Sequence, residues 1–200
     1  MSNHEVEQAW RAVIDLLTEV APVTAASIRP STNTDFDAAE RELGFPLNDE
    51  LRAWFGLHDG AEQAVGTVLP SFGLVGLDEA VQDSNMIFRI WSSGGDTPAT
   101  DGPAGSWAYS WHRQFVQIGE WDADSMFVDL RAGPLRGCVR YFAKEDNDMD
   151  DERWDSVTAL LQEIHNSIST GTPTSSWVPN IQHGILDWTI APGLVEPRSL

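Results

Sequence analysis

Apolar residues near the start of the chain recur at helical intervals. Between residues 4 and 20 they stand at steps of three and four, at Val6, Trp10, Val13, Leu17 and Val20. This is the spacing of one apolar face on a helix. A first helix is therefore predicted over residues 4–20, ended by Pro22.

Two shorter helices are predicted next. Thr34 and Asp37 have the spacing of a capping box, in which side chains satisfy backbone groups at the start of a helix. Gly44 would end this helix, because glycine readily takes the left-handed conformation of a C-cap. The next helix is predicted to begin at Asn48, whose side-chain oxygen can accept a bond from a backbone N–H, and to end at His58.

From residue 65 onward, short runs of β-branched and aromatic residues alternate with Gly, Pro and Asp, which is typical of strands. The predicted strands are residues 65–69, 72–76, 115–118, 126–130 and 137–142. The last two, joined by residues 131–136, are expected to pair as an antiparallel hairpin.

Helical spacing returns in two further segments, and the remaining stretches are irregular. Helices are predicted over residues 77–91 and 152–168, with a long surface loop over residues 92–106. The last thirty residues carry several prolines together with Trp177 and Trp188, and they are predicted to form an extended tail laid across the domain.

Charge narrows the classes of partner. The 200 residues hold 12 Lys and Arg against 31 Asp and Glu, a formal net charge of −19. This surplus opposes binding to phosphate backbones and anionic bilayers, so neither nucleic acid nor a membrane surface is expected as a partner. No segment has the pattern of a signal peptide or a membrane span, and Cys138 is the single cysteine, so a cytoplasmic location is expected.

Motifs give catalysis little support. The sequence lacks the serine turn of hydrolases, the phosphate-binding loop of nucleotide enzymes and the glycine pattern of dinucleotide-binding folds. No catalytic residue, metal ligand or cofactor is predicted. Among the five histidines, His58 stands beside Asp59, so an unrecognised hydrolase that uses carboxylates with His58 or His112 stays open as an alternative.

Acidic residues form two candidate contact segments. They are Glu120, Asp122 and Asp124 before the predicted hairpin, and Asp146, Asp148, Asp150 and Asp151 before the last helix. The second segment resembles the opening of a calcium loop, but it lacks the glycine and the final glutamate that such a loop requires. We interpret its carboxylates as stabilising the start of the last helix. If charge complementarity drives binding, both segments would meet a basic protein.

The chain also carries the pattern of a known family. Leu43-Gly44 is followed by Pro46 at the entry to a helix, by Leu51-Arg52 within it and by a terminal Asp59-Gly60. Similar positions follow at residues 72–80, 115–119, 126–130 and 137–139. From about residue 6 to residue 168 the sequence resembles the SUKH superfamily, which contains a fungal cell-wall-synthesis regulator and many bacterial immunity proteins.

The resemblance implies a mixed α/β (α+β) fold, a single twisted and largely antiparallel sheet flanked by helices. This domain would span residues 1–168, with residues 169–200 as an extension packed on it. The resemblance supplies no catalytic residues. It implies a non-enzymatic protein-binding module, an immunity protein that neutralises a cognate toxin, for example a basic nuclease domain. The alternative is an intracellular regulatory scaffold of the kind found among the fungal relatives.

Overall fold

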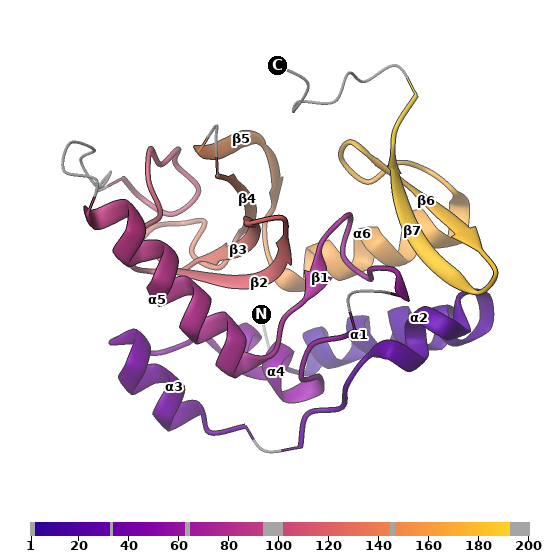
Figure 1. Ribbon diagram of the computed structural model, residues 1–200, viewed down its shortest axis with the longest axis horizontal. Helices are drawn as coiled ribbons and strands as arrows, with labels where there is room; N and C mark the ends of the chain where they lie inside the picture. Colours follow the sequence, from indigo (N-terminus) through magenta and orange to yellow (C-terminus); the bar gives the residue numbers. More distant parts are fainter. Residues whose placement is uncertain (1–2, 33, 63–64, 94–101, 145–146, 193–200) are drawn as a thin grey trace.

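The computed structural model describes residues 3–32, 34–62, 65–93, 102–144 and 147–192, and it has the expected mixed α+β class (Figure 1). The helices are α1 (Asn3–Val20), α2 (Pro22–Ser27), α3 (Phe36–Leu43), α4 (Asp49–Leu57), α5 (Leu77–Ser93) and α6 (Val157–Thr170). The strands are β1 (Gly73–Leu74), β2 (Phe115–Trp121), β3 (Asp124–Asp129), β4 (Val139–Ala143), β5 (Asn147–Trp154), β6 (Trp177–Gln182) and β7 (Ile185–Ile190). Strands β1 to β5 form one five-stranded antiparallel sheet in chain order, and β6 and β7 form a separate hairpin.

The helical spacing of the first 60 residues predicts their elements well. Helix α1 follows the predicted range, and Asn48 caps α4 by accepting a hydrogen bond from the backbone N–H of Leu51 at 3.0 Å. Pro22, expected only to end the first helix, also opens α2, because its fixed φ suits the first turn of a helix.

The predicted cap of α3 was wrong by one residue. The carboxylate of Asp35, not the hydroxyl of Thr34, accepts the N–H of Ala38 at 2.9 Å. The Thr34 hydroxyl lies instead at 2.6 Å from that of Ser31. The stop at Gly44 is confirmed, since this residue takes a φ of 82° in the left-handed region.

The predicted hairpin is confirmed, whereas the strand at residues 65–69 was wrong. Strands β3 and β4 pair antiparallel, with Val128 opposite Val139. Residues 65–69 belong to no named strand: the N–H of Thr67 donates to the carbonyl of Leu186 at 3.0 Å, and Gly66, at a φ of +88°, lies so close to that carbonyl that a Cβ would meet it at 2.2 Å. The predicted strand at residues 72–76 shortens to β1.

The last helix begins later than its spacing predicted. Residues 147–154, read as acidic loop and first helical turn, form the edge strand β5, which pairs with β4. Helix α6 starts at Val157, where the hydroxyl of Ser156 accepts the N–H of Ala159 at 3.0 Å. Trp154 fitted the helical pattern because it is buried against the same core from the end of a strand.

Part of the predicted C-terminal tail is a hairpin rather than a single extended segment. Residues 177–190 form the β6–β7 hairpin, whose turn at His183 and Gly184 has φ values of 54° and 78°. The hairpin lies beside α2 and α6 (Figure 1). The hydroxyl of Thr24 accepts the N–H of Leu186 at 2.8 Å, and the indole N–H of Trp188 donates to the carbonyl of Thr67 at 3.0 Å.

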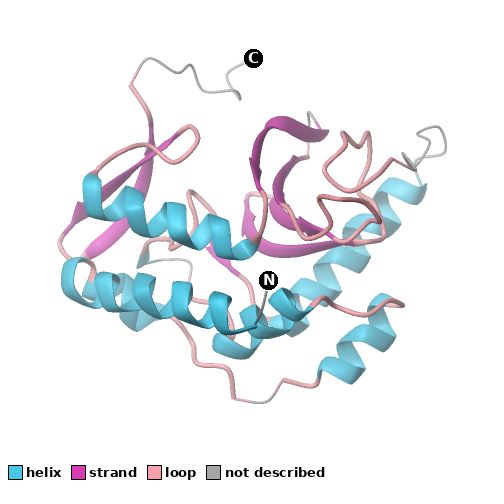
Figure 2. Ribbon diagram, turned by 180° about the vertical axis from the view of Figure 1, so that it is seen from behind, coloured by secondary structure: helices cyan, strands magenta, loops and turns pink. Residues whose placement is uncertain are grey.

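The two faces of the large sheet pack against different cores (Figures 1 and 2). One face joins a large apolar core with α1, α4 and α6, through Val116, Ile118, Met126, Val128, Val139 and Tyr141. The other face forms a smaller aromatic core with Trp111 and the C-terminal half of α5, through Phe115, Phe127 and Phe142. This second side carries the surface described next.

Candidate interaction surface

The first acidic segment lies at the tight turn between β2 and β3. Asp122 and Ala123 have φ values of 48° and 68°, so both turn residues are left-handed, as in the commonest two-residue hairpins. The exposed carboxylate of Asp122 forms an ion pair with Lys144 at 3.0 Å, and Glu120 is half-buried. Both carboxylates are placed at the surface.

Asp124 has a different environment from the one predicted. This residue is only 5% exposed, and its carboxylate accepts the backbone N–H of Lys144 at 2.8 Å. It therefore ties the start of β3 to the end of β4 and offers little area to a partner. This burial could not be predicted from nearby residues, because the backbone donor lies 20 residues away along the chain.

The second acidic segment lies on the edge strand β5. The backbone of Asp148 pairs with Phe142, while Asp150 and Asp151 fall in an irregular stretch of the same strand. Asp146 lies outside the described residues. The sheet register places Asp148 and Glu120 in one row across β5, β4, β3 and β2, so the two predicted segments lie at the same end of the sheet, three strands apart.

Asp83 on α5, a carboxylate that the sequence did not single out, lies near Glu120, and Glu79 lies near Asp83. Helix α5 packs on β2, where the hydroxyl of Ser84 accepts the N–H of Gln117 at 3.0 Å. This packing brings Asp83 close to Glu120, and Glu79 lies one turn earlier on the helix. Burial, followed by the charges of Glu79 and Glu120, raises the pKa of Asp83 above its ordinary value. Like charges thus gather where α5 meets β2.

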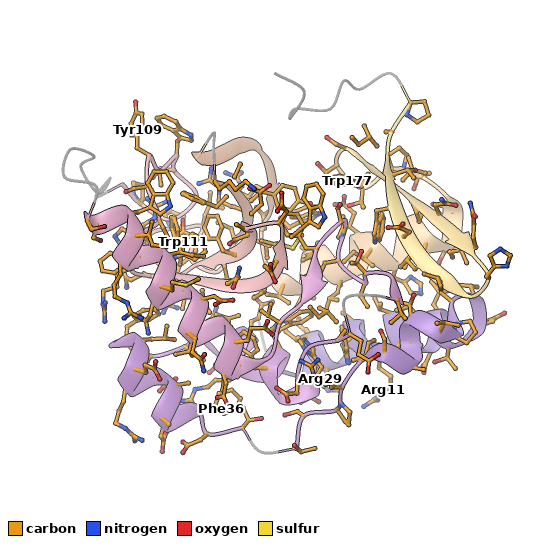
Figure 3. All side chains as sticks on the ribbon, viewed as in Figure 1. Arg11, Arg29, Phe36, Tyr109, Trp111 and Trp177 are labelled. Carbon is orange, nitrogen blue, oxygen red and sulfur yellow. The ribbon has the colours of Figure 1, made fainter. Side chains whose placement is uncertain are left out.

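Exposed apolar side chains continue this surface toward the end of α5. Met86 is 48% exposed and Ile90 is 60% exposed, while the neighbouring Ile87, Phe88 and Trp91 pack onto the aromatic core. Tyr109 is 46% exposed and forms an edge contact with the ring of Trp107 at 3.7 Å between centroids. Figure 3 shows Tyr109 standing away from the ribbon near the C-terminal end of α5.

A buried ionic cluster holds the segment that carries Tyr109. Asp129, which is fully buried, forms an ion pair with Arg131 at 2.8 Å and accepts the N–H of Gly105 at 2.9 Å. Arg131 and Arg140 both donate to the carbonyl of Ser106, at 2.6 Å and 2.7 Å. Buried charges are stable only with such pairing, so these bonds fix residues 105–106 against the sheet.

His58 lies deep in the large core. It is 1% exposed, and its ring centroid lies 5.0 Å from that of Trp10 and 4.4 Å from that of Trp54. Its Nδ1 accepts the N–H of Gly60 at 3.0 Å, which places the ring proton on Nε2. Burial, and then the charge of Arg29, lowers the pKa of His58 to about 3. The imidazole is therefore neutral and out of contact with solvent.

His112 and Cys138 are not placed to act together with His58. Half-buried His112 accepts the N–H of Gln114 on its Nδ1 at 3.0 Å and packs against Phe115. Burial, together with Asp129, raises the pKa of the buried Cys138 thiol to about 12, so the thiol stays protonated. The Cys138 thiol thus lacks the environment of an activated nucleophile.

Two surface hollows lie beside α3, and neither His58 nor His112 lines them. These open hollows of about 580 Å³ and about 400 Å³ both include Asp37 in their walls. An ion pair between Arg52 and Glu40 at 2.7 Å lies between them. Among the described residues no three His, Cys, Asp or Glu side chains are grouped to hold a metal ion. In the same residues no helix has the length and apolar character needed to cross a bilayer.

Comparison with known proteins identifies one family. Residues 30–163 match the model of the SMI1 / KNR4 family (SUKH-1). The matched segment runs from before α3 into α6 and contains all five strands of the large sheet, whereas α1, α2 and the C-terminal hairpin lie outside it. No curated protein matches the chain.

Proposed function

The chain belongs to the SMI1 / KNR4 family (SUKH-1), and from this membership we propose that it is a non-enzymatic immunity protein that binds and neutralises a cognate toxin. The family match over residues 30–163 is the observation that carries the proposal. Proteins of this family interact with other proteins in general. The chain would act in the cytoplasm, where it would block a toxin that has entered the cell or was made there.

The electrostatics of the chain support a basic toxin as the partner. The net charge of −19 attracts a cationic protein from a distance and repels nucleic acid, which many toxins attack. The carboxylates at one end of the sheet give this charge a local focus. Occupying the cationic substrate groove of a nuclease is one way in which such a surface would neutralise it.

The surroundings of the candidate catalytic groups support the non-enzymatic part of the proposal. A general base needs both access to substrate and a pKa near the working pH. His58 meets neither condition, and His112 lines neither of the two hollows beside α3. The hydrolase alternative thus gains no support from the described residues.

Co-expression with a toxin tests the proposal directly. Each toxin domain encoded beside the gene is expressed in a sensitive host with and without this chain, and growth and complex formation are measured. We expect one of them to be neutralised and to co-purify with the chain. If no culture survives although the chain is folded and abundant, the proposal is contradicted. A stable complex with host proteins instead would favour the regulatory scaffold.

Salt dependence tests the electrostatic part. The association rate with the neutralised toxin should fall by about ten-fold or more between low salt and roughly 0.3 M, because ions screen long-range attraction. An association rate that does not change with salt would reject a basic surface as the partner.

A further inference from the structure

Four residues form a mixed acidic and apolar stripe on the outer side of α5. Glu79, Asp83, Met86 and Ile90 follow one another at steps of four, three and four. This spacing places them on one side of the helix, along about 16 Å of its axis. Glu120 adjoins the acidic end of the stripe, and Tyr109 stands near its apolar end. We call these six residues the α5 face.

Two other sides of α5 contact the rest of the fold, while Asp78 and Gln82 stay exposed beside the stripe. The inner side of α5 is buried and carries Leu77, Ala80, Val81 and Ser84. On a third side, the amide of Asn85 donates to the carbonyl of Glu42 at 3.3 Å and so connects α5 to α3. The guanidinium of Arg89 bonds to the carbonyl of Asn85 at 3.1 Å, and this exposed cation lies one turn from Met86. The α5 face thus borders the exposed side of the helix, with Met86 and Ile90 exposed and Glu79 and Asp83 half-buried.

Exposed apolar groups of this size have a cost in water. Met86, Ile90 and Tyr109 each keep between 46% and 60% of their surface accessible. Apolar and aromatic side chains that gather at the surface beside polar groups are typical of protein interaction sites. The buried pair of Asp129 and Arg131 also anchors the chain at Ser106, three residues before Tyr109, which limits the backbone freedom lost on binding.

Resting on the proposed function, we propose that the α5 face is the partner-binding surface and that its partner is a basic protein segment with an apolar anchor. The anchor would cover Met86 and Ile90. Lys or Arg side chains of the partner would lie against Glu79, Asp83 and Glu120.

The charges favour this occupant over a neutral one. Glu79 and Glu120 both repel a charge on Asp83, so a cation placed among them removes an unfavourable interaction that the free chain carries. A guanidinium can also lie over the ring of Tyr109, a contact that aromatic rings offer to cations. The apolar half would supply affinity, and the acidic half would set orientation and association rate.

A designed peptide tests the surface without requiring the toxin. The probe is an 18-residue helical peptide of Lys and Leu with all Leu on one face, and its matched control replaces each Leu by Gln. Binding to the full chain is measured by fluorescence anisotropy at low salt. We expect the Leu peptide to bind about ten-fold more tightly than the Gln peptide, because only the former can cover Met86 and Ile90.

Two double variants locate the binding site. Glu79→Lys with Asp83→Lys should weaken binding of the Leu peptide by about ten-fold or more, whereas Met86→Gln with Ile90→Gln should remove the preference for Leu over Gln. The charge control is Asp15→Lys with Glu19→Lys on α1, an exposed pair with the same spacing and the same change in charge. This control should weaken binding by less than about three-fold.

The outcomes separate the inference from the proposed function. Equal weakening by the α1 control, or no preference of the wild type for the Leu peptide, would overturn the α5 face as a specific site. If the Glu79→Lys, Asp83→Lys double variant still neutralises the toxin in co-expression, the α5 face is also overturned as the binding site, while the proposed function stands. Conversely, if no toxin is neutralised but the peptide results hold, the surface stands and the proposed function falls.

Discussion

The two sides of the large sheet differ in how completely they are covered. Toward α1, α4 and α6, apolar side chains of the strands meet apolar helix faces, and the core is continuous and buried. Toward α5, a small aromatic core is shared with one helix and one irregular segment, and Met86, Ile90 and Tyr109 stay exposed.

The difference indicates that one side of the sheet determines stability and the other is available for recognition. The helices packed on the first side bury enough apolar area to determine stability, so substitutions there should affect folding. On the α5 side, a buried ionic cluster holds a loop in place, and the outer residues contribute little to the fold. Such residues are free to serve recognition, and the following changes test this contrast.

The largest effect is expected from removing the buried anion of the α5 side. Asp129→Ala leaves Arg131 and Arg140 buried without this carboxylate, and it should lower the free energy of unfolding by about 3–5 kcal/mol. Urea unfolding monitored by tryptophan fluorescence measures the loss. Asp122→Asn, which removes an exposed ion pair with Lys144 and keeps a residue type that tolerates the left-handed turn, is the control and should change stability by less than about 1 kcal/mol. Similar values for both variants would contradict the role given to the cluster.

A second change compares apolar residues on the two sides. Leu161→Ala empties space in the fully buried core beneath α6 and should cost about 3 kcal/mol. Ile90→Ala on the α5 face should change the free energy of unfolding by less than about 0.5 kcal/mol, because that side chain is mostly in water. A costly Ile90→Ala in the same urea titrations would show that the α5 face is structural.

Acid should weaken the first side through His58. Because the fold lowers the pKa of His58 from 6.5 to about 3, its contribution to stability is complete above pH 6.5 and is lost as the pH falls toward 3. Between pH 7 and pH 5 this single group should cost about 2 kcal/mol. In His58→Asn, which can still accept the N–H of Gly60, the loss between the two pH values should shrink by that amount. An unchanged loss would assign the acid sensitivity to other groups.

The smallest effect concerns Asp83 on the α5 face. The raised pKa of Asp83 means that its charge opposes folding once the pH exceeds that pKa. Asp83→Asn should therefore stabilise the chain at pH 7 by a few tenths of a kcal/mol, a small value because water screens this half-exposed group. As the pH falls well below 3.8 the gain should vanish, since Asp83 is then protonated in both the folded and the unfolded chain. Thermal unfolding at both pH values checks the sign.

Local signals predicted the elements that depend on near neighbours. The cap at Asn48 and the stop at Gly44 act within one or two helical turns, and the hairpin of β3 and β4 follows from two apolar runs and a short connection. Strand β5 was missed because its acidic residues suit a solvated loop, and only pairing with β4 makes it a strand. The C-terminal hairpin was missed because its prolines indicated an irregular tail. The partner that holds it, Thr24, lies 162 residues away along the chain.

The candidate site shows the same limit. Glu120 and Asp122 were predicted from charge and lie at the surface, but Asp124 is buried by a backbone donor far along the chain. Glu79 and Asp83 were read simply as part of a helix, because nothing near them in the chain marks the approach of Glu120.

The sequence by itself determined the helix boundaries near the start, the antiparallel hairpin, the strong negative charge and the family, since each of these is recorded in residue types and short spacings. Only the tertiary structure decided which carboxylates share a surface, which histidine stays neutral and which apolar side chains stay in water. These properties depend on contacts between residues far apart in the chain, and burial and charge proximity are set by such contacts rather than by local pattern.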